Sequence, residues 1–573
     1  MRYVLSYLNP YKYKLIVNLI VKSGATLMEL FLPWILAYVI DSVIPTENVP
    51  SIIIFGVIML LCSGLAFYGN VVANRMAARI SSDAIKTLRD DGYSKIMNFS
   101  NRTVDEFKIP SLVSRMTTDT YHIYRMFNVV QRIGVRAPIL LLGSIFLMVM
   151  IDLSLALVLI ALLPLIAIVI YVISRRGVPY YSQLQKELDS LIRIVRENIA
   201  GIRVIKALAK EKDERIKFEQ VNRAVSKKER SAGYVVSMLN PMMNFLLNMG
   251  LIMILYFGAI RVSQGLSQTG SIIAFLTYFT LILMSFLALN RIFLMYSRAS
   301  ASANRIIEIL QREDAFEIIV SEAIPTDLHI EFKNVDFSYN KAKNHIENIS
   351  FQIKRNQTFG IIGSTGSGKS TIAQLLLRFY DVDQGQILIN GKDIKSYDLK
   401  ELRSKFGVVL QNDVLFSSTV SDNIRFGRSV DDESLSEAAE MAQASEFIDK
   451  LNEKYGQEVL RGGANFSGGQ RQRMLIARAL ADHPEILIFD DASSALDYKT
   501  DADLRNRLRK SGMSTVILIA QRVSTVLSAD QILVIEEGRI VGLGTHAQLI
   551  EDCDVYRELV ELQLGGREYV NAA

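Results

Sequence analysis

Six apolar runs in the first half of the sequence limit what this chain can fold into. They lie near residues 15–40, 52–74, 134–151, 154–173, 234–260 and 270–295. Each run is long enough to cross a lipid bilayer as a helix. Six such runs are hard to explain as the buried helices of a soluble protein. We therefore expect residues 1–310 to form an all-α transmembrane domain with six spans, embedded in a lipid bilayer.

The charges beside these runs predict how the chain is oriented. Residues 75–136 contain 11 Lys or Arg and residues 174–232 contain 15, whereas the three opposite loops contain only Arg261. Because Lys and Arg accumulate in cytoplasmic loops, we expect both basic segments and the N-terminus in the cytoplasm. Their patterns are helical, so the spans should continue beyond the bilayer as long extensions. This local excess explains the net charge of +5 without a nucleic-acid partner.

The turns of the two basic segments are candidate contact points for a soluble domain. Residues 107–116 lie at the first turn and residues 209–214 at the second. Either stretch could be a short coupling helix, or it could be the solvated tip of a helical hairpin. The sequence leaves both interpretations open.

Polar residues inside the spans are candidates for a substrate path. Glu29 lies in the middle of the first span, and Asn240, Asn244 and Asn248 share one face of the fifth. Ionisable residues are costly in hydrocarbon and often mark a pathway, in which Glu29 could pair with a cationic compound. Neighbouring methionine and aromatic side chains suit loosely specified apolar ligands. Asparagine also joins helices in membranes, so a packing role remains the alternative.

The composition changes after a linker at residues 311–327. Strand and helix patterns alternate over residues 328–564, which predicts an α/β domain, and residues 565–573 form a tail. The two cysteines, Cys62 and Cys553, lie in different halves of the chain and do not indicate a disulfide framework.

The second domain contains a phosphate-binding loop. Its pattern is a glycine, four residues and then Gly-Lys-Ser, here Gly363, Ser364, Thr365, Gly366, Ser367, Gly368, Lys369 and Ser370. An apolar strand pattern precedes the loop, and a helical pattern follows from Ser370 and Thr371. Backbone N–H groups of such a loop surround phosphate oxygens, with the positive end of the helix dipole behind them. Lys369 would reach the outer phosphates, and the Ser370 hydroxyl would bind Mg²⁺.

Two further motifs follow this loop. Residues 486–490 form an apolar strand that ends in Asp490, whose carboxylate would hold Mg²⁺ through water. Between the loop and this strand lie Phe466, Ser467, Gly468, Gly469 and Gln470. This order of motifs resembles the nucleotide-binding domain of ABC transporters. With six spans ahead of it, nearly the whole chain resembles an ABC exporter half-transporter of the bacterial inner or plasma membrane.

The resemblance implies roles for residues that no local pattern explains. Tyr339 matches the aromatic residue that stacks on adenine, and Gln411 matches the glutamine that contacts Mg²⁺ and the coupling helices. Residues 494–497, starting at Ser494, match a loop that crosses to a partner subunit. Ser467, Gly468, Gly469 and Gln470 would complete the ATP site of that partner. Each ATP site would therefore be built from two chains.

Several positions depart from the family pattern. Phe466 stands where leucine is usual, and Arg461 lies near a position that is often acidic. More important, Asp491 stands where the hydrolytic glutamate is expected, and Gln521 replaces the switch histidine. Such pairs resemble the degenerate-site subunit of bacterial heterodimeric multidrug exporters. The catalytic group would then be Lys369, Asp491 and Gln521, and it would bind ATP but hydrolyse it poorly.

This resemblance implies ATP-dependent efflux of apolar or amphipathic compounds, together with a second, catalytically complete half-transporter. Several alternatives stay open: transport of a specific lipid, peptide or metal chelate, import instead of export, a slow homodimer, or a gating protein of the same fold. A soluble ABC-type ATPase that acts on nucleic acid is disfavoured by the six spans and the loop charges.

Overall fold

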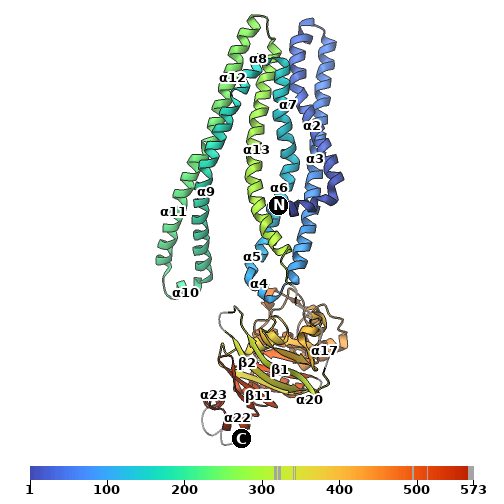
Figure 1. The fold of residues 1–573 in the computed structure, drawn as a ribbon, viewed down its shortest axis with the longest axis vertical. Helices are drawn as coiled ribbons and strands as arrows, with labels where there is room; N and C mark the ends of the chain where they lie inside the picture. The colour runs from blue at the N-terminus through green and yellow to red at the C-terminus, as the bar shows by residue number, and fades with distance from the viewer. Residues whose placement is uncertain are drawn as a thin grey trace. The chain divides into compact units, whose positions relative to one another are not determined.

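The computed structural model describes residues 1–314, 316, 319, 324–339, 341, 344–492, 496–512 and 514–564. They form two compact units, which are drawn in Figure 1. The first contains Met1–Met97 and Ile109–Arg312. The second contains Asn98–Lys108 and the chain from Glu313 onward. The expected tail, residues 565–573, and part of the expected linker lie outside the described residues.

The first unit is helical. Among the described residues, six helical stretches are long and apolar enough to span a membrane: Arg2–Thr46, Val49–Met97, Ile109–Ile151, Leu153–Ala200, Glu211–Ser263 and Thr269–Leu310. Each of the six predicted apolar runs falls within one of them, which confirms the predicted six-span architecture. The α-helices of these stretches are α1 (Arg2–Leu5), α2 (Lys12–Tyr38), α3 (Val49–Met97), α5 (Ile109–Ser114), α6 (Thr120–Val129), α7 (Val135–Ile151), α8 (Leu153–Ile160), α9 (Leu163–Ala200), α11 (Glu211–Ser237), α12 (Leu239–Ser263) and α13 (Thr269–Leu310). Two short helices lie between stretches: α4 (Asn101–Phe107), which belongs to the second unit, and α10 (Ile202–Ala207).

Side-chain packing and a few hydrogen bonds join the spans. Helix α2 lies against α3, α7 and α13, and α9 runs beside α11. The core of the spans contains Phe275, Tyr278 and Phe279 from α13 and Leu30 from α2. The Tyr278 hydroxyl donates a hydrogen bond of 2.8 Å to the Leu30 carbonyl oxygen. Van der Waals contact and interhelical hydrogen bonds of this kind hold helices together where water is absent.

One carboxylate organises the short turn between α7 and α8. Asp152 accepts hydrogen bonds from the Ser154 and Leu155 N–H groups and so caps the start of α8. Its other oxygen accepts from Arg261 Nε at 2.9 Å. Arg261 is the one cation of the three short loops, and it is therefore matched within the protein.

The short helix of the first turn lies earlier than predicted. It is α4, which begins after Ser100, whose side chain accepts from the Thr103 N–H group. It ends at Lys108, whose φ of +63° breaks the helix. The stretch 107–116, predicted as the tip, instead contains mostly the returning helix α5 and its continuation.

The second turn is shifted in the same direction. Helix α10 lies between Gly201 and the left-handed residue Ala209, whose φ is +51°. The predicted stretch 209–214 mostly begins α11. Its acidic residues occupy the first helical turn of α11, where negative charge stabilises the helix dipole.

The second unit is an α/β domain, as predicted. Within the described residues, one sheet has the order β2-β1-β4-β5, a second the order β12-β11-β3-β10-β9-β6, and β7 pairs with β8. The strands are β1 (Leu328–Phe337), β2 (Ile346–Lys354), β3 (Thr358–Gly363), β4 (Gln384–Ile389), β5 (Lys392–Asp393), β6 (Phe406–Val409), β7 (Ser418–Thr419), β8 (Glu458–Val459), β9 (Ile486–Asp490), β10 (Thr515–Ala520), β11 (Gln531–Glu536) and β12 (Arg539–Gly544). The helices are α14 (Lys369–Leu376), α15 (Leu399–Ser404), α16 (Val420–Arg425), α17 (Asp432–Met441), α18 (Ser445–Ile448), α19 (Gly468–Leu480), α20 (Tyr498–Ser511), α21 (Val523–Val526), α22 (His546–Asp552) and α23 (Asp554–Leu564).

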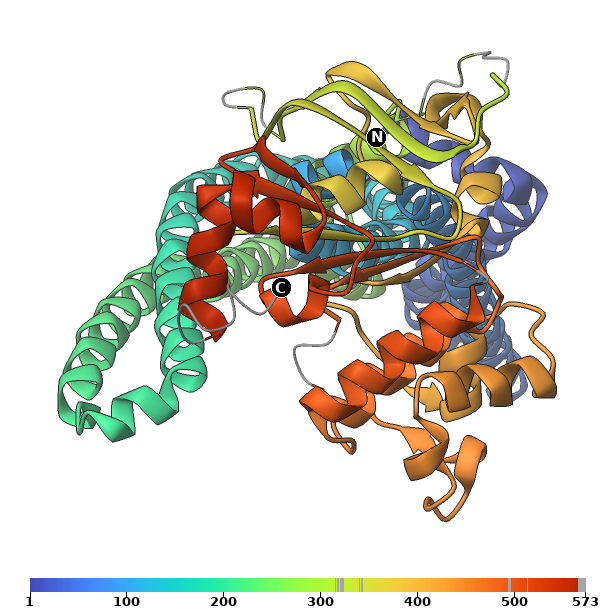
Figure 2. The same ribbon diagram turned by 90° about the horizontal axis from the view of Figure 1, so that it is seen from below.

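The central strands of the second sheet, β3, β9 and β10, are buried, and Figure 2 shows helices on either side of this sheet. Alternate residues of β10 enter different cores: Ile517 and Ile519 join one cluster, Val516 and Leu518 the other. Strands β11, β3, β10, β9 and β6 are parallel, so their carboxyl ends share one edge. Ligands bind at that edge in open α/β sheets.

The segment Asn98–Lys108 belongs to the second unit through specific hydrogen bonds. Asp314 accepts from the Ser100 N–H group at 2.6 Å and from its hydroxyl at 2.9 Å. Asp105, on α4, accepts from the Tyr380 hydroxyl at 2.6 Å. Burial, followed by the bond to Asp105, raises the pKa of Tyr380, so the hydroxyl keeps its proton and acts as the donor.

We predict that Tyr380→Phe loosens this segment. The change removes one hydrogen bond from a half-buried hydroxyl to a carboxylate, and the resulting loss is about 1 kcal/mol. Amide hydrogen exchange over residues 98–108 should become roughly fivefold faster. Tyr397→Phe is the control, because the Tyr397 hydroxyl bonds the Ile389 carbonyl oxygen, away from this segment. Equal protection of residues 98–108 in the Tyr380→Phe variant and the parent protein would contradict the attachment.

Candidate functional site

The predicted phosphate loop lies between a strand and a helix, as its pattern requires. It leaves β3 at Gly363 and enters α14 at Lys369. Glycine is necessary at two of its positions. A Cβ on Gly363 would lie 2.1 Å from the Ile535 carbonyl oxygen, and Gly368 has a φ of +103°. The loop is therefore a tight turn that larger residues would disrupt.

Lys369 is buried in the curve of this loop. Its Nζ donates to the Gly363 carbonyl oxygen at 2.9 Å and to the Ser364 carbonyl oxygen at 2.7 Å. Burial lowers the pKa of Lys369, while the nearby carboxylates of Asp490 and Asp491 raise it in part. The loop thus holds a fixed, desolvated positive charge beside the N-terminus of α14.

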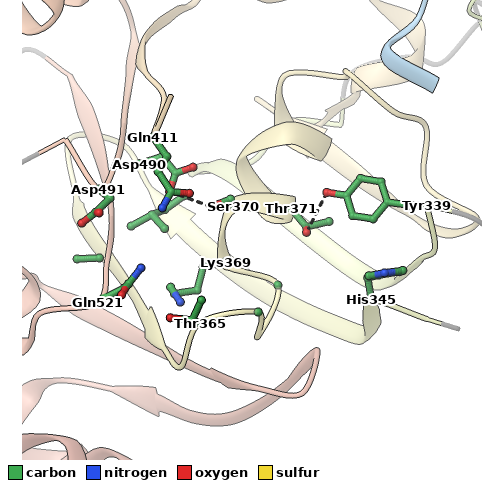
Figure 3. A pocket seen from close by; sticks show the side chains of 14 residues that line it. Tyr339, His345, Thr365, Lys369, Ser370, Thr371, Gln411, Asp490, Asp491 and Gln521 are labelled. Atoms are coloured by element: carbon green, nitrogen blue, oxygen red, sulfur yellow. Dashed lines mark hydrogen bonds between the residues drawn. The ribbon is translucent and has the colours of Figure 1, made fainter. Parts of the chain in front are cut away.

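Asp490 lies beside the phosphate loop because of the sheet order. It ends β9, which is separated from β3 only by β10. The Ser370 hydroxyl donates to Asp490 Oδ1 at 3.0 Å, as Figure 3 shows. Burial raises the pKa of Asp490, the charge of Asp491 adds to this, and the bond from Ser370 opposes it. The motifs that were separate in sequence therefore converge at one sheet edge.

Tyr339 is held in a fixed orientation on the opposite side of the pocket. Its hydroxyl donates to Gln374 Oε1 at 2.8 Å and lies 3.1 Å from the Thr371 hydroxyl. His345 and Tyr380 contact its ring edge-to-face, with centroids 4.9 and 5.1 Å away. Sequence reasoning missed these two residues because neither belongs to a motif. A flat aromatic ring held this way offers a stacking surface for a base.

Asp491 and Gln521 lie across the pocket from Tyr339 (Figure 3). The Asp491 backbone is left-handed, with a φ of +53°, and its N–H group donates to the Ile519 carbonyl oxygen at 2.8 Å. Burial raises the pKa of the Asp491 carboxyl, against the opposing charges of Arg522 and Lys369. Gln521 directly follows β10. Both departures from the family pattern therefore lie on one wall.

The cavity between these walls brings together most of the residues predicted to bind nucleotide and Mg²⁺. It is lined by Tyr339, His345, Thr365, Gly366, Gly368, Lys369, Ser370, Thr371, Gln411, Asp490, Asp491, Ile519, Ala520 and Gln521. Three further loop residues, Gly363, Ser364 and Ser367, form the turn without lining the cavity.

The Ser-Gly-Gly-Gln stretch lies elsewhere. Ser467 caps α19: its hydroxyl accepts from the Gln470 N–H group, and the Gln470 side chain accepts from the Ser467 N–H group. Ser467 and Gly468 are exposed, Gly469 is half-buried, and none of them lines the cavity. Phe466 is 8% exposed and contacts Phe447, so the departure from leucine fills the core.

The predicted crossing loop is only partly described. Ser494 and Ala495 lie outside the described residues. Asp497 caps α20, because its carboxylate accepts from both the N–H group and the hydroxyl of Thr500. Leu496 is buried.

These groups fit a polyphosphate with a hard divalent cation. The loop presents a lysine and a helix N-terminus, which bind phosphate oxygens. Ser370, Gln411 and Asp490 present oxygen atoms toward the same cavity. The described residues contain no cluster of three or more His, Cys, Asp or Glu that could hold a metal ion. Mg²⁺ suits such a sparse oxygen set, since it takes few protein ligands together with water and substrate phosphates.

Comparisons with known proteins agree with this architecture. Residues 15–286 match the ABC transporter transmembrane region, and residues 346–494 match the ABC transporter family model. An uncharacterized ABC transporter ATP-binding protein of Mycobacterium tuberculosis is 35% identical over 568 residues, covering 97% of each chain. The Bacillus subtilis ABC transporter ATP-binding protein YfiB is 33% identical and covers 99% of each chain.

The fold matches a solved structure described as a bacterial Atm1-family ABC exporter with ATP bound. The TM-score is 0.80 at 24% identity, covering 98% of this chain and 99% of that chain. The chain thus belongs to the ABC transporter family, as a transport ATPase that carries a six-span membrane domain and an ATP-binding domain on one polypeptide.

Proposed function

We propose that this protein is one subunit of a heterodimeric ABC exporter that moves apolar or amphipathic compounds out of a bacterial cell. Its own Walker site would retain ATP and hydrolyse it slowly, while a second, catalytically complete half-transporter performs most of the turnover. In this proposal residues 1–310 are the membrane domain and residues 328–564 the motor domain. The N-terminus and the motor domain lie in the cytoplasm.

The groups placed to bind nucleotide support the proposal that this chain's own site retains ATP. Tyr339, Lys369, Ser370, Gln411 and Asp490 all line one cavity. Tyr339 would stack on adenine, Lys369 would bind the outer phosphates, and the other three would hold Mg²⁺. When bound, the cation would neutralise phosphate charge and orient the phosphates. The groups that this chain contributes to binding MgATP are therefore present in one cavity.

The position of Asp491 is the observation that supports slow ATP hydrolysis at this chain's own site. Its backbone is tied to β10 by the bond to Ile519, so it is not free to advance toward the cavity. Aspartate has one methylene fewer than glutamate. Its carboxylate therefore ends one bond length, about 1.5 Å, farther from the attacking water. A base must reach its proton within roughly 2.6–3.2 Å. Asp491 should therefore activate water poorly.

Gln521, on the same wall of the cavity, should also slow hydrolysis at this site relative to the partner's site. An amide can donate hydrogen bonds to a phosphate, but it does not acquire the positive charge of a protonated histidine. The site would lose the charge stabilisation that a histidine supplies as the phosphoryl group leaves. Binding would persist and turnover would fall.

The position of Ser467, Gly468 and Gly469 supports a two-chain assembly. These residues are removed from the cavity of their own chain, and two of them are exposed at the start of α19. Backbone N–H groups at a helix N-terminus bind anions well. A second chain would place its nucleotide against them, and this chain would thereby complete the faster site.

The exposed faces of the fifth span support an apolar or amphipathic substrate. Asn240, Asn244 and Asn248 are exposed within this chain, and so are Phe245 and Tyr256 nearby on α12. This mixed surface of amide and aromatic groups could line a path shared with the partner subunit.

We predict that Asp491→Ala lowers the ATPase rate of the purified assembly by less than about twofold. In a background where the partner's catalytic acid is neutralised, Asp491→Glu combined with Gln521→His should restore turnover. The expected gain is about 10²-fold, the usual contribution of a positioned general base. Steady-state phosphate release would measure both effects.

The matched control in that background is Gln521→His alone. It keeps the shorter side chain of Asp491 and should restore little ATPase activity. A slow homodimer is the competing arrangement. If this chain purifies alone and Asp491→Ala removes most of its ATPase activity, the asymmetric proposal is wrong.

We also predict that Tyr339→Ala weakens ATP binding by roughly 5- to 150-fold, because a stacked base contributes about 1–3 kcal/mol. Tyr339→Phe keeps the ring and loses only the hydroxyl bond to Gln374, so its affinity should stay within a few-fold of the parent. Equilibrium binding of a fluorescent ATP analogue measures both variants. Equal affinities in all three proteins would remove Tyr339 from the site.

A further inference from the structure

A polar pocket lies between helices α2, α3 and the turn that leads into α7. Its volume is about 550 Å³, and six charged or amide residues line it: Lys22, Glu29, Asn70, Asn74, Arg132 and Arg136. Three of these side chains are cationic and one is a carboxylate, so the pocket carries a net charge of +2. Charge in a membrane-spanning region is costly and usually has a function.

Glu29 does not serve here as a free counter-charge for cations, which the sequence had suggested. Its Oε2 accepts from Arg136 Nη2 at 2.8 Å and from Arg136 Nε at 3.0 Å. Its Oε1 accepts from Asn70 Nδ2 at 2.8 Å. The carboxylate already has a cationic partner within the protein, and a cationic compound would have to compete with it.

Among the described residues, the hydrogen bonds of the other two cations go to neutral acceptors. Lys22 is 3% exposed, and its Nζ donates to Asn70 Oδ1 at 2.6 Å and to Asn74 Oδ1 at 3.2 Å. Arg132 Nε donates to Asn74 Oδ1 at 3.2 Å, and Arg132 Nη1 lies 3.4 Å from Asn128 Oδ1. Amide oxygens satisfy these donors without cancelling their charge. An anion in the pocket would be attracted by both.

The depth of the pocket matches a lipid headgroup. Asn70 follows the start of α3 at Val49 by about 32 Å of helix, and the hydrocarbon core of a bilayer is about 30 Å thick. The pocket thus lies near the membrane boundary on the side of the long helical extensions. Phe67, which is 72% exposed, and Leu32 line it with apolar surface. Arg132 and Arg136 are exposed at its polar side.

We propose that this pocket binds the anionic headgroup, phosphate or carboxylate, of an amphipathic molecule. The guanidinium group of Arg132 contacts the headgroup, because its planar N–H pairs fit such oxyanions. Lys22 adds positive charge from behind, and the apolar tail lies along Phe67. The molecule is either a resident lipid or a transported compound; only the second source rests on the proposed export function.

Dodecyl phosphate tests this assignment, with dodecyltrimethylammonium as the oppositely charged probe on the same chain. Both are radiolabelled and added to the purified assembly in phosphatidylcholine nanodiscs without ATP. We expect saturable binding of dodecyl phosphate. Arg132→Glu should weaken it about tenfold or more and Arg132→Gln less, since these variants remove two charge units and one.

The matched control is Arg79→Glu. Arg79 is an exposed arginine of α3 that does not line the pocket, so the same charge reversal there should leave binding within about twofold of the parent. Thermal unfolding of each variant separates lost binding from lost folding, and Arg132→Lys, which keeps the charge, should retain most of the affinity. Preference for the ammonium probe, no saturable phosphate binding, or an equal loss in Arg79→Glu would overturn the proposal.

Inside-out vesicles distinguish the two sources. ATP-dependent accumulation of dodecyl phosphate, lost in Arg132→Glu, identifies a transported anionic amphiphile. Binding without accumulation identifies a resident lipid. Both outcomes support the site. Neither depends on which ATP site hydrolyses faster, so a failure of the asymmetric-motor proposal would be recognised separately by the Asp491 variants.

Discussion

The parallel register of β3, β10 and β9 is the constraint on which the nucleotide site depends. Parallel strands end at a common edge, so this register places the phosphate loop, Asp490 and Gln521 around one cavity. The strands are apolar on both faces and are buried between two cores, which makes a one-residue slip costly. The catalytic geometry is therefore fixed by hydrophobic packing. The positions of the site side chains follow from the register of the strands that carry them.

The parts that could be predicted from sequence were those that local pattern determines. Length and apolarity were enough for the six spans, and the glycine spacing was enough for the phosphate loop. The two candidate stretches at the turns lay a few residues beyond α4 and α10, because a cap such as Ser100 and a left-handed residue such as Ala209 are weak signals in a sequence. The partners of Tyr339 and Glu29 depend on contacts across the fold, for which one sequence contains no pattern.

The membrane domain shows how polar groups on neighbouring spans satisfy one another. Glu29, Arg136, Lys22 and their asparagine neighbours join α2, α3 and α7 in one hydrogen-bonded network. A group of this kind stabilises the helix arrangement only while every member keeps its partners, because an unpaired charge at that depth is strongly destabilising. The same network leaves cationic groups in excess, so its structural role and a ligand-binding role are compatible.

Asp152 has a mechanical consequence for the same domain. One carboxylate both caps α8 and binds Arg261 of α12, so the two helices are pinned together at the ends that meet the short loops. Helices α9 and α11 continue side by side away from that pin and are joined through α10. A small tilt about the pinned end would be amplified along this lever, and the largest excursion would occur at α10. The α9–α11 pair is therefore held most firmly where Asp152 binds Arg261, and its α10 end would undergo the largest displacement.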